Sequence, residues 1–400
     1  MKIFNHQNLF LLLLTSLILL IGFPPNSVQA KTTISVEDVA VFYEYGGQAT
    51  FQALITSDVP IKIVYISIQS IGQGTRLIEL TPGSQGEVLV QVDIQKLALR
   101  PFAPVDYWFE VVPEQGDHLI SQKYQFDYID NRFEWNTLKS DSIQIHWLGD
   151  DRNFGQDIFN VAEQALETVP SLIQAVPPVP LIIYVYRNPG DLQTALSLIH
   201  QSWVAGHASP DLGTILLSVP ETPSQRLDLE RQIPHELIHI LLYKETGTSY
   251  PQIPAWLNEG MASMAELYPN PDYPRAMEKA IQANGLLSMN QLCSTFPPDA
   301  SNAFLAYAQS ASFMDYLYNK FGSPGINRLI NVYKNGLGCE EGFKTALGFS
   351  LSDLETQWKQ ESLGMDMAGL AWRNLGPYIF LALIILIPAF LVGAFFLRKS

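Results

Sequence analysis

His235 and His239 lie four residues apart, and Glu236 directly follows the first of them. Because an α-helix turns once in about 3.6 residues, both imidazoles lie on one helix face and can bind the same metal ion. Glu236 lies beside that pair with a free carboxylate, where the general base for a metal-bound water is needed. The segment therefore predicts a helix that carries two metal ligands and a catalytic base.

A carboxylate further along the chain completes this ligand set. A catalytic zinc site with two histidines needs a third protein ligand, and Glu259 follows in the run from Pro254 to Ala262. Nineteen residues separate His239 from Glu259, enough for the rest of one helix, a turn and the start of a second helix. We predict one catalytic Zn²⁺ ion held by His235, His239 and Glu259. The structural alternative is two packed or exposed histidines and a solvated glutamate.

The order His-Glu-x-x-His, then Trp-Leu-Asn-Glu-Gly-x-Ala, resembles the gluzincin metallopeptidases and, more narrowly, the membrane-associated peptidase MA-like domains. The resemblance covers roughly residues 138 to 365 and implies a zincin fold, a zinc ion and a peptide or protein substrate. The second segment also resembles the M1 aminopeptidases. The spacer here is one residue longer than is usual in that family, and no Gly-x-Met-Glu-Asn segment precedes it, so aminopeptidase specificity is not implied.

The resemblance also implies a second electrophile opposite the metal, supplied by a tyrosine or histidine of a helical lobe. Tyr307 follows Glu259 in the expected part of the chain and is our candidate. The alternative is a core aromatic residue at helical spacing with Phe304 and Phe313. His207, beside Gly206, is a weaker candidate, and we interpret His146 and His200 as packing or surface residues.

The pattern of short apolar runs divides the chain. Runs between Val39 and Val112, separated by turn residues such as Pro82-Gly83, predict an antiparallel β-sandwich of immunoglobulin or fibronectin type III kind over residues 31–135. Residues 138–366 predict a zincin-like domain with a small sheet and a helical C-terminal lobe, so the chain is an α+β protein. Thr214–Val219 is the candidate edge strand for substrate backbone, with a core strand as an equal alternative.

Apolar segments near both ends predict the location. Residues 1–30 have the features of a signal peptide cleaved after Ala30, with an uncleaved anchor as the alternative. Residues 378–397 carry no charge and are long enough for a transmembrane helix, which leaves 398–400 as a cytoplasmic tail. We therefore expect a single-pass protein of the cell membrane, tethered through this C-terminal helix, with the catalytic domain extracytoplasmic.

Charge and cysteine content limit the partners and cross-links. The formal net charge of −15 argues against nucleic acid as a partner. Cys293 and Cys339 lack the spacing of a metal site, and they either pair with each other or remain two buried thiols.

Two functions are compatible with these features. The first is a membrane-tethered zinc metallopeptidase in which Glu236 activates the water that attacks the peptide bond. The alternative is a catalytically silent binding or scaffold protein that retains the peptidase fold. The intact Glu236 favours the enzyme, because a silent relative has no need of a base.

Overall fold

The computed structural model describes residues 33–173, 175–197, 206–366 and 375–387. It divides the chain into two compact units, Met1–Ile129 and Asp130–Ser400. The predicted signal segment 1–30 and the predicted tail 398–400 lie outside the described residues.

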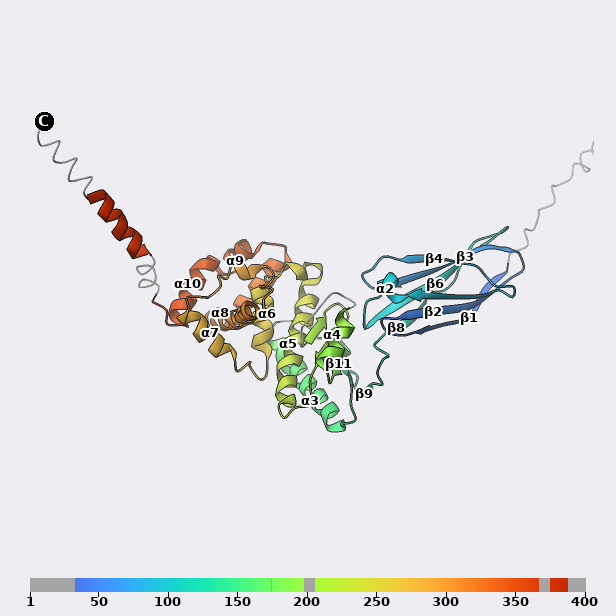
Figure 1. Cartoon of the computed structure of the whole chain (residues 1–400), viewed down its shortest axis with the longest axis horizontal. Coiled ribbons are helices and arrows are strands. Elements are labelled where there is room, and N and C mark those ends of the chain that lie inside the picture. The colour runs from blue at the N-terminus through green and yellow to red at the C-terminus, as the bar shows by residue number, and fades with distance from the viewer. Residues whose placement is uncertain (1–32, 174, 198–205, 367–374, 388–400) are drawn as a thin grey trace, which may run out of the picture. The chain divides into compact units, whose positions relative to one another are not determined.

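Two antiparallel sheets make up the N-terminal unit, drawn in blue and cyan in Figure 1. One sheet has the order β1-β2-β5, and the other has the order β4-β3-β6-β7 with β8 also paired to β6. The elements are β1 (Ile34–Tyr43), β2 (Gln48–Ser57), β3 (Ile61–Ser70), β4 (Arg76–Leu80), β5 (Glu87–Asp93), the short helix α2 (Ile94–Leu97), β6 (Ala103–Pro113), β7 (Leu119–Ile120) and β8 (Tyr124–Tyr128).

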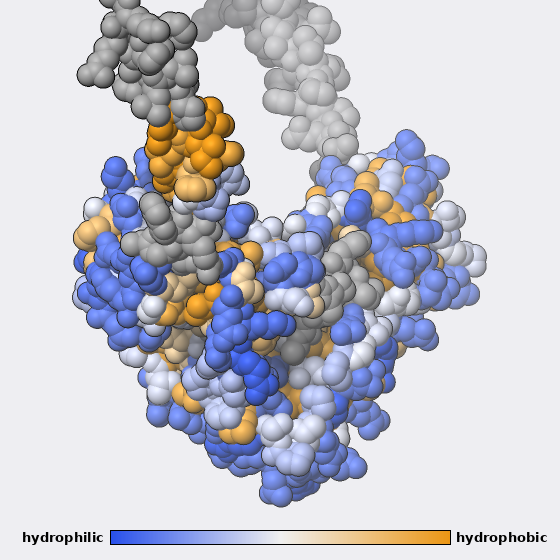
Figure 2. Space-filling model, turned by 60° about the vertical axis from the view of Figure 1, so that its left-hand side comes forward, coloured by the Kyte–Doolittle hydropathy of each residue, from blue (hydrophilic) through white to orange (hydrophobic). Residues whose placement is uncertain are grey.

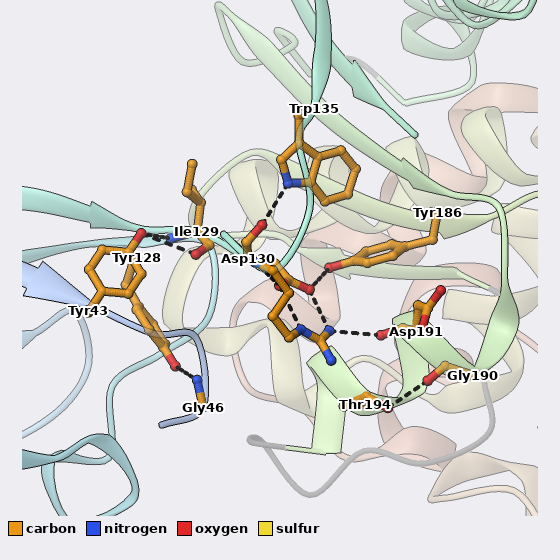
Figure 3. Close-up of polar contacts among 11 residues, drawn as sticks. Tyr43, Gly46, Tyr128, Ile129, Asp130, Trp135, Tyr186, Gly190, Asp191 and Thr194 are labelled. Atoms are coloured by element: carbon orange, nitrogen blue, oxygen red, sulfur yellow. Dashed lines mark hydrogen bonds and ion pairs between the residues drawn. The ribbon is translucent and has the colours of Figure 1, made fainter. Parts of the chain in front are cut away.

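The core of this unit lies between the two sheets. Alternate residues of β6 are buried along its whole length, as expected for a strand with one face on a core. Phe51 of β2 contacts Tyr107 and Phe126 of the other sheet, with ring centroids 5.2 and 6.1 Å away. At the end of the unit the Tyr43 hydroxyl donates to the Ile129 carbonyl at 3.1 Å (Figure 3).

One mixed sheet of five strands, in the order β12-β13-β11-β10-β9, organises the C-terminal unit. Its three middle strands are parallel, and the two edge strands run antiparallel to their neighbours. The strands are β9 (Asn136–Lys139), β10 (Ile143–Trp147), β11 (Leu181–Tyr186), β12 (Gly206–Ser209) and β13 (Thr214–Ser218).

Helices supply the rest of this unit (Figure 1). Apolar residues of α3 and α5 pack with the sheet, and those of α6, α8, α9 and α10 continue the same core. The helices are α3 (Arg152–Thr168), η1 (Val169–Ser171), α4 (Pro189–Ser197), α5 (Gln225–Thr246), η2 (Gly247–Gln252), α6 (Ala255–Ala265), α7 (Tyr273–Gln282), η3 (Gln291–Cys293), α8 (Ala300–Lys334), α9 (Cys339–Leu347) and α10 (Leu351–Glu361).

A buried carboxylate fixes the start of the C-terminal unit on its sheet. Asp130 is fully buried, and its carboxylate accepts from Arg132 Nη2 at 2.6 Å and from the Tyr186 hydroxyl at 2.8 Å. The Trp135 indole donates to the Asp130 carbonyl at 2.8 Å (Figure 3). The segment that leads into β9 is therefore held by both charge and hydrogen bonds.

A disulfide joins Cys293 of η3 to Cys339 at the start of α9. The structure thus decides between the two alternatives for these cysteines in favour of the pair. The bond links two elements of the helical part that are 46 residues apart in sequence.

The prediction of a transmembrane helix at 378–397 is wrong, because no helix among the described residues is long and apolar enough to cross a membrane. Residues 388–397 lie outside the described part. The predicted location, a single-pass protein of the cell membrane, was built on that helix and is therefore wrong as well. The exposed apolar residues of 375–387 form the orange band in Figure 2.

Candidate metal centre

The three predicted ligands come from two helices that pack against each other. His235 and His239 lie one turn apart on α5, and Glu259 lies in the second turn of α6. His239 is buried, and the other two are partly exposed at the same point of the surface. The spacing of the histidines on a helix and the entry of α6 after η2 bring these side chains together, as the sequence predicts.

Their donor atoms converge on one point. Glu259 Oε2 lies 3.5 Å from His235 Nε2 and 3.8 Å from His239 Nε2. One ligand atom from each of the three residues falls within 4.8 Å of the other two, and no other such group of three was found among the described residues. The arrangement leaves room for one ion between the three donors.

Each histidine has an acceptor behind it that settles which ring nitrogen faces the point of convergence. His235 Nδ1–H donates to Glu266 Oε1 at 3.0 Å, and His239 Nδ1–H donates to Asn258 Oδ1 at 3.1 Å. When the ring is neutral and carries its proton on Nδ1, the lone pair of Nε2 faces the point of convergence and can bind a metal ion. Glu266 and Asn258 therefore orient both rings for binding.

Pro234 lies inside α5 and leaves one carbonyl of that helix without its usual partner. A proline inside a helix has no N–H for the carbonyl four residues earlier, which here is that of Glu230. The Leu267 N–H uses this free carbonyl at 2.9 Å. The residue directly after Glu266, just beyond the end of α6, is thereby tied to α5.

The carboxylate of Glu236 lies against the edge strand β12. A Cβ on Gly206 would come within 2.6 Å of Glu236 Oε1. Any larger residue at this position would therefore force the carboxylate to move. The Ala208 backbone N–H donates to the Glu236 side chain. The predicted base is thus positioned by the strand that borders the site.

A pocket of about 400 Å³ opens over the convergence point. Its walls come from β12, α5, η2, α6 and α8, and its lining includes Tyr307, the predicted second electrophile, and His207, the weaker candidate. The ring of Tyr307 packs edge-on against Phe296 with centroids 5.0 Å apart. Tyr250 of η2 lines the same pocket and brings a second phenol to it.

Burial and neighbouring charges shift the pKa values of the acids and bases in this pocket. Burial by itself lowers the pKa of His235, but its interactions with Glu259 and Glu266 outweigh it and raise the pKa to about 10. Burial raises the pKa of Glu236. Burial also acts to raise the pKa of Glu259, but the charge of His239 and the interaction with His235 prevail and lower it. Burial and the charges of Glu259 and Glu236 raise the pKa of Tyr307.

Two further expectations have a definite outcome. Thr214–Val219 is not an edge strand, because β13 pairs with β11 on one side and with β12 on the other. The edge beside the pocket is β12. His146 is buried in the sheet, stacked on Tyr184 with centroids 4.4 Å apart, so it is a packing residue. His200 lies outside the described residues.

Sequence reasoning missed three residues that contact the predicted site. Glu266 lies seven residues, or two helical turns, after Glu259, and that spacing could have indicated a partner for a ligand. Tyr250 and Gly206 carry no such signal, because a short 3₁₀ turn and an edge strand bring them in from outside both motif helices.

The profile of the Peptidase MA superfamily matches residues 161–363, more than half of the chain. The chain belongs to this superfamily, which confirms the resemblance drawn from its motifs. Membership in a family of peptidases also indicates that the chain is a peptidase and that its substrates are peptides. No curated protein matches the chain.

Solved structures similar to parts of the chain were also found. A carbohydrate-binding module family 56 β-1,3-glucan-binding domain is 9% identical over 24% of this chain and 98% of its own, with a TM-score of 0.17. A structure described as a myokine is 16% identical over 24% and 96%, with a TM-score of 0.20. A catalytically inactive OgpA from Akkermansia muciniphila, in complex with an O-glycopeptide, is 17% identical over 25% and 30%, with a TM-score of 0.20. At these TM-scores the similarities support no conclusion.

Proposed function

We propose that the chain is a zinc-dependent peptidase of the gluzincin type. In this proposal His235, His239 and Glu259 bind one Zn²⁺ ion, Glu236 is the general base, and Tyr307 donates to the oxyanion. The observation that carries the proposal is the convergence of Glu259 Oε2 on both histidine Nε2 atoms, at 3.5 and 3.8 Å.

The donor set fits zinc. Ligands about 2.05 Å from a tetrahedral ion are about 3.4 Å from one another, close to the separations between Glu259 and the two histidines. Both Nδ1 atoms are bound to acceptors, so in the neutral rings both Nε2 atoms are directed at the ion, which displaces the Nε2 proton of His235 on binding. Three protein ligands with one open position are typical of a catalytic zinc site, whereas a structural site has four.

Zinc in such a site lowers the pKa of a bound water to about 7 and polarises a carbonyl oxygen. The protein groups do the rest. Glu236, held by the Ala208 N–H, accepts the proton of the attacking water and returns it to the leaving amine. Tyr307 keeps its proton near neutral pH, because its pKa is raised, and donates a hydrogen bond to the oxygen that gains charge.

Zinc analysis combined with peptide-library digestion tests this function on the full chain. We expect one zinc per chain and hydrolysis in the wild type, full zinc without hydrolysis in Glu236→Gln, and loss of zinc in Glu259→Ala. Stoichiometric zinc in Glu259→Ala would refute the ligand assignment. Zinc binding without hydrolysis of any peptide in the wild type would instead favour a silent binding protein.

A further inference from the structure

Tyr250 lines the pocket without belonging to either motif helix. Its hydroxyl meets the side-chain amide of Asn258. Asn258 Nδ2 donates to the Tyr250 oxygen at 3.2 Å, and the Tyr250 hydroxyl donates to Asn258 Oδ1 at 3.4 Å. The phenol therefore contacts the residue that accepts from His239.

The orientation of the Asn258 amide matters for metal binding. With Oδ1 towards His239, the ring is protonated on Nδ1 and its Nε2 is free. With the amide turned over, Nδ2 would face Nδ1, and the ring would carry its proton on Nε2, where it cannot bind a metal. An amide free to rotate would populate both states.

We propose that Tyr250 is a positioning residue that holds the Asn258 amide so that His239 presents Nε2 to the metal. The inference rests on the proposed zinc site and extends it from the ligand and its hydrogen-bond partner to a third residue. By accepting from Nδ2 and donating to Oδ1, the phenol bonds both ends of the amide and holds its plane, while the His239 Nδ1–H bonds the same Oδ1. The Tyr250 ring is itself held in place, edge-on against Tyr243 at a centroid distance of 5.8 Å.

The two histidines are supported differently, and this difference supplies the control. Glu266 behind His235 is a carboxylate with two equivalent oxygens, so rotation cannot turn a donor towards the ring. Asn258 behind His239 has one acceptor and one donor end. An Asn258→Asp substitution gives His239 the same kind of support as His235 and removes the need for Tyr250.

The test is a double-mutant cycle on zinc affinity, measured with the full chain by competition with a chromophoric chelator. Tyr250→Phe should raise the zinc dissociation constant roughly tenfold, the usual cost of losing such a partner. In the Asn258→Asp background the same change should alter the constant by less than about twofold. Tyr243→Phe, which removes the neighbouring phenol but keeps its ring, should leave zinc affinity unchanged.

Each other outcome is informative. Unchanged zinc affinity in Tyr250→Phe, or an equal loss of affinity in the wild-type and Asn258→Asp backgrounds, would overturn the positioning role. In the second case Tyr250 would act on the fold or the substrate and not through the amide. A wild type that binds no zinc would refute the proposed function as well, so the two failures are distinguishable.

Discussion

At the scale of single residues, the convergence of the three proposed ligands was predictable because their positions follow from helix geometry. His235, His239 and Glu259 needed only the helical period and a spacer long enough for a turn. The residues that position them were not predictable in the same way. Gly206 and Tyr250 reach the site through tertiary packing, which no local spacing records.

Gly206 gives a residue-scale prediction. A methyl group at this position would overlap Glu236 Oε1 and displace the carboxylate, whereas the proposed metal ligands belong to α5 and α6 and not to β12. We expect Gly206→Ala to lower kcat at least tenfold, while the stoichiometry and affinity of zinc stay at wild-type values. Gly338→Ala, at an open position with an ordinary φ of −66°, is the matched control. Full activity of Gly206→Ala would show that the base does not depend on this contact.

His146 gives a prediction for the dependence of stability on pH. Burial lowers its pKa from 6.5 to about 4, and its neutral ring accepts from Gln144 Nε2 at 2.8 Å and bonds Thr137 at 3.0 Å. Between these pKa values the unfolded chain binds the extra proton, so the free energy of unfolding falls as the pH drops from 6.5 towards 4. The loss amounts to about 3 kcal/mol.

A comparison of His146→Phe with the wild type isolates this effect. The difference in free energy of unfolding between the two, measured by urea denaturation, should change by about that amount between pH 7 and pH 4. The free energy of unfolding of the wild type should fall relative to that of His146→Phe as the pH drops. A pH-independent difference would show that His146 titrates alike in the folded and unfolded chains.

At the scale of elements, the sequence signals were strongest where one period ran without interruption. The succession of short strands between Val39 and Val112, and the helix that carries the histidine pair, could be predicted directly from the sequence. The order of the strands could not, and the expected edge strand proved to be interior, because a strand of four residues, β12, covers it. The helix α8 is interrupted at Gly322, where the backbone leaves the helical conformation with φ of 64°.

Pro234 gives a prediction at this scale. Pro234→Ala restores an N–H that competes with Leu267 for the Glu230 carbonyl, so the end of α6 should loosen from α5. One lost hydrogen bond of about 1 kcal/mol corresponds to roughly fivefold faster exchange of the Leu267 amide. We also expect a severalfold weaker zinc affinity, because Glu266 is the adjacent residue.

Hydrogen exchange and chelator competition measure the two effects. Pro274→Ala is the control, since a proline in the first turn of α7 leaves no helical carbonyl unpaired. Unchanged exchange at Leu267 in Pro234→Ala would mean that the freed carbonyl does not hold the two helices together.

At the scale of the whole molecule, the pattern of short apolar runs predicted a β domain followed by a second domain, and the structure divides the chain into two compact units. The site lies entirely in the second. Its core draws on residues from Ile143 to Trp358, and every residue of the pocket lies between Gly206 and Tyr307. The length and apolar character of residues 378–397 could not decide whether they form a membrane-spanning helix. A long uncharged segment is necessary for a helix to cross a membrane, but it is not sufficient.

The location of the site predicts that residues 130–366 produced alone bind zinc as the full chain does. The N-terminal unit contributes no ligand and no partner of a ligand among the residues that the structure describes. Zinc dissociation constants of the two proteins should agree within about twofold, a difference of less than about 0.5 kcal/mol. A loss of zinc by a folded 130–366 fragment would show that the first unit is needed to form the site.

Anomalous X-ray scattering at the zinc absorption edge, from crystals of the zinc-loaded protein, tests the ligand set most directly. We predict a single strong peak about 2.0–2.2 Å from His235 Nε2, His239 Nε2 and a carboxylate oxygen of Glu259. A peak bound by other residues, or none at this position in protein that contains zinc, would contradict it.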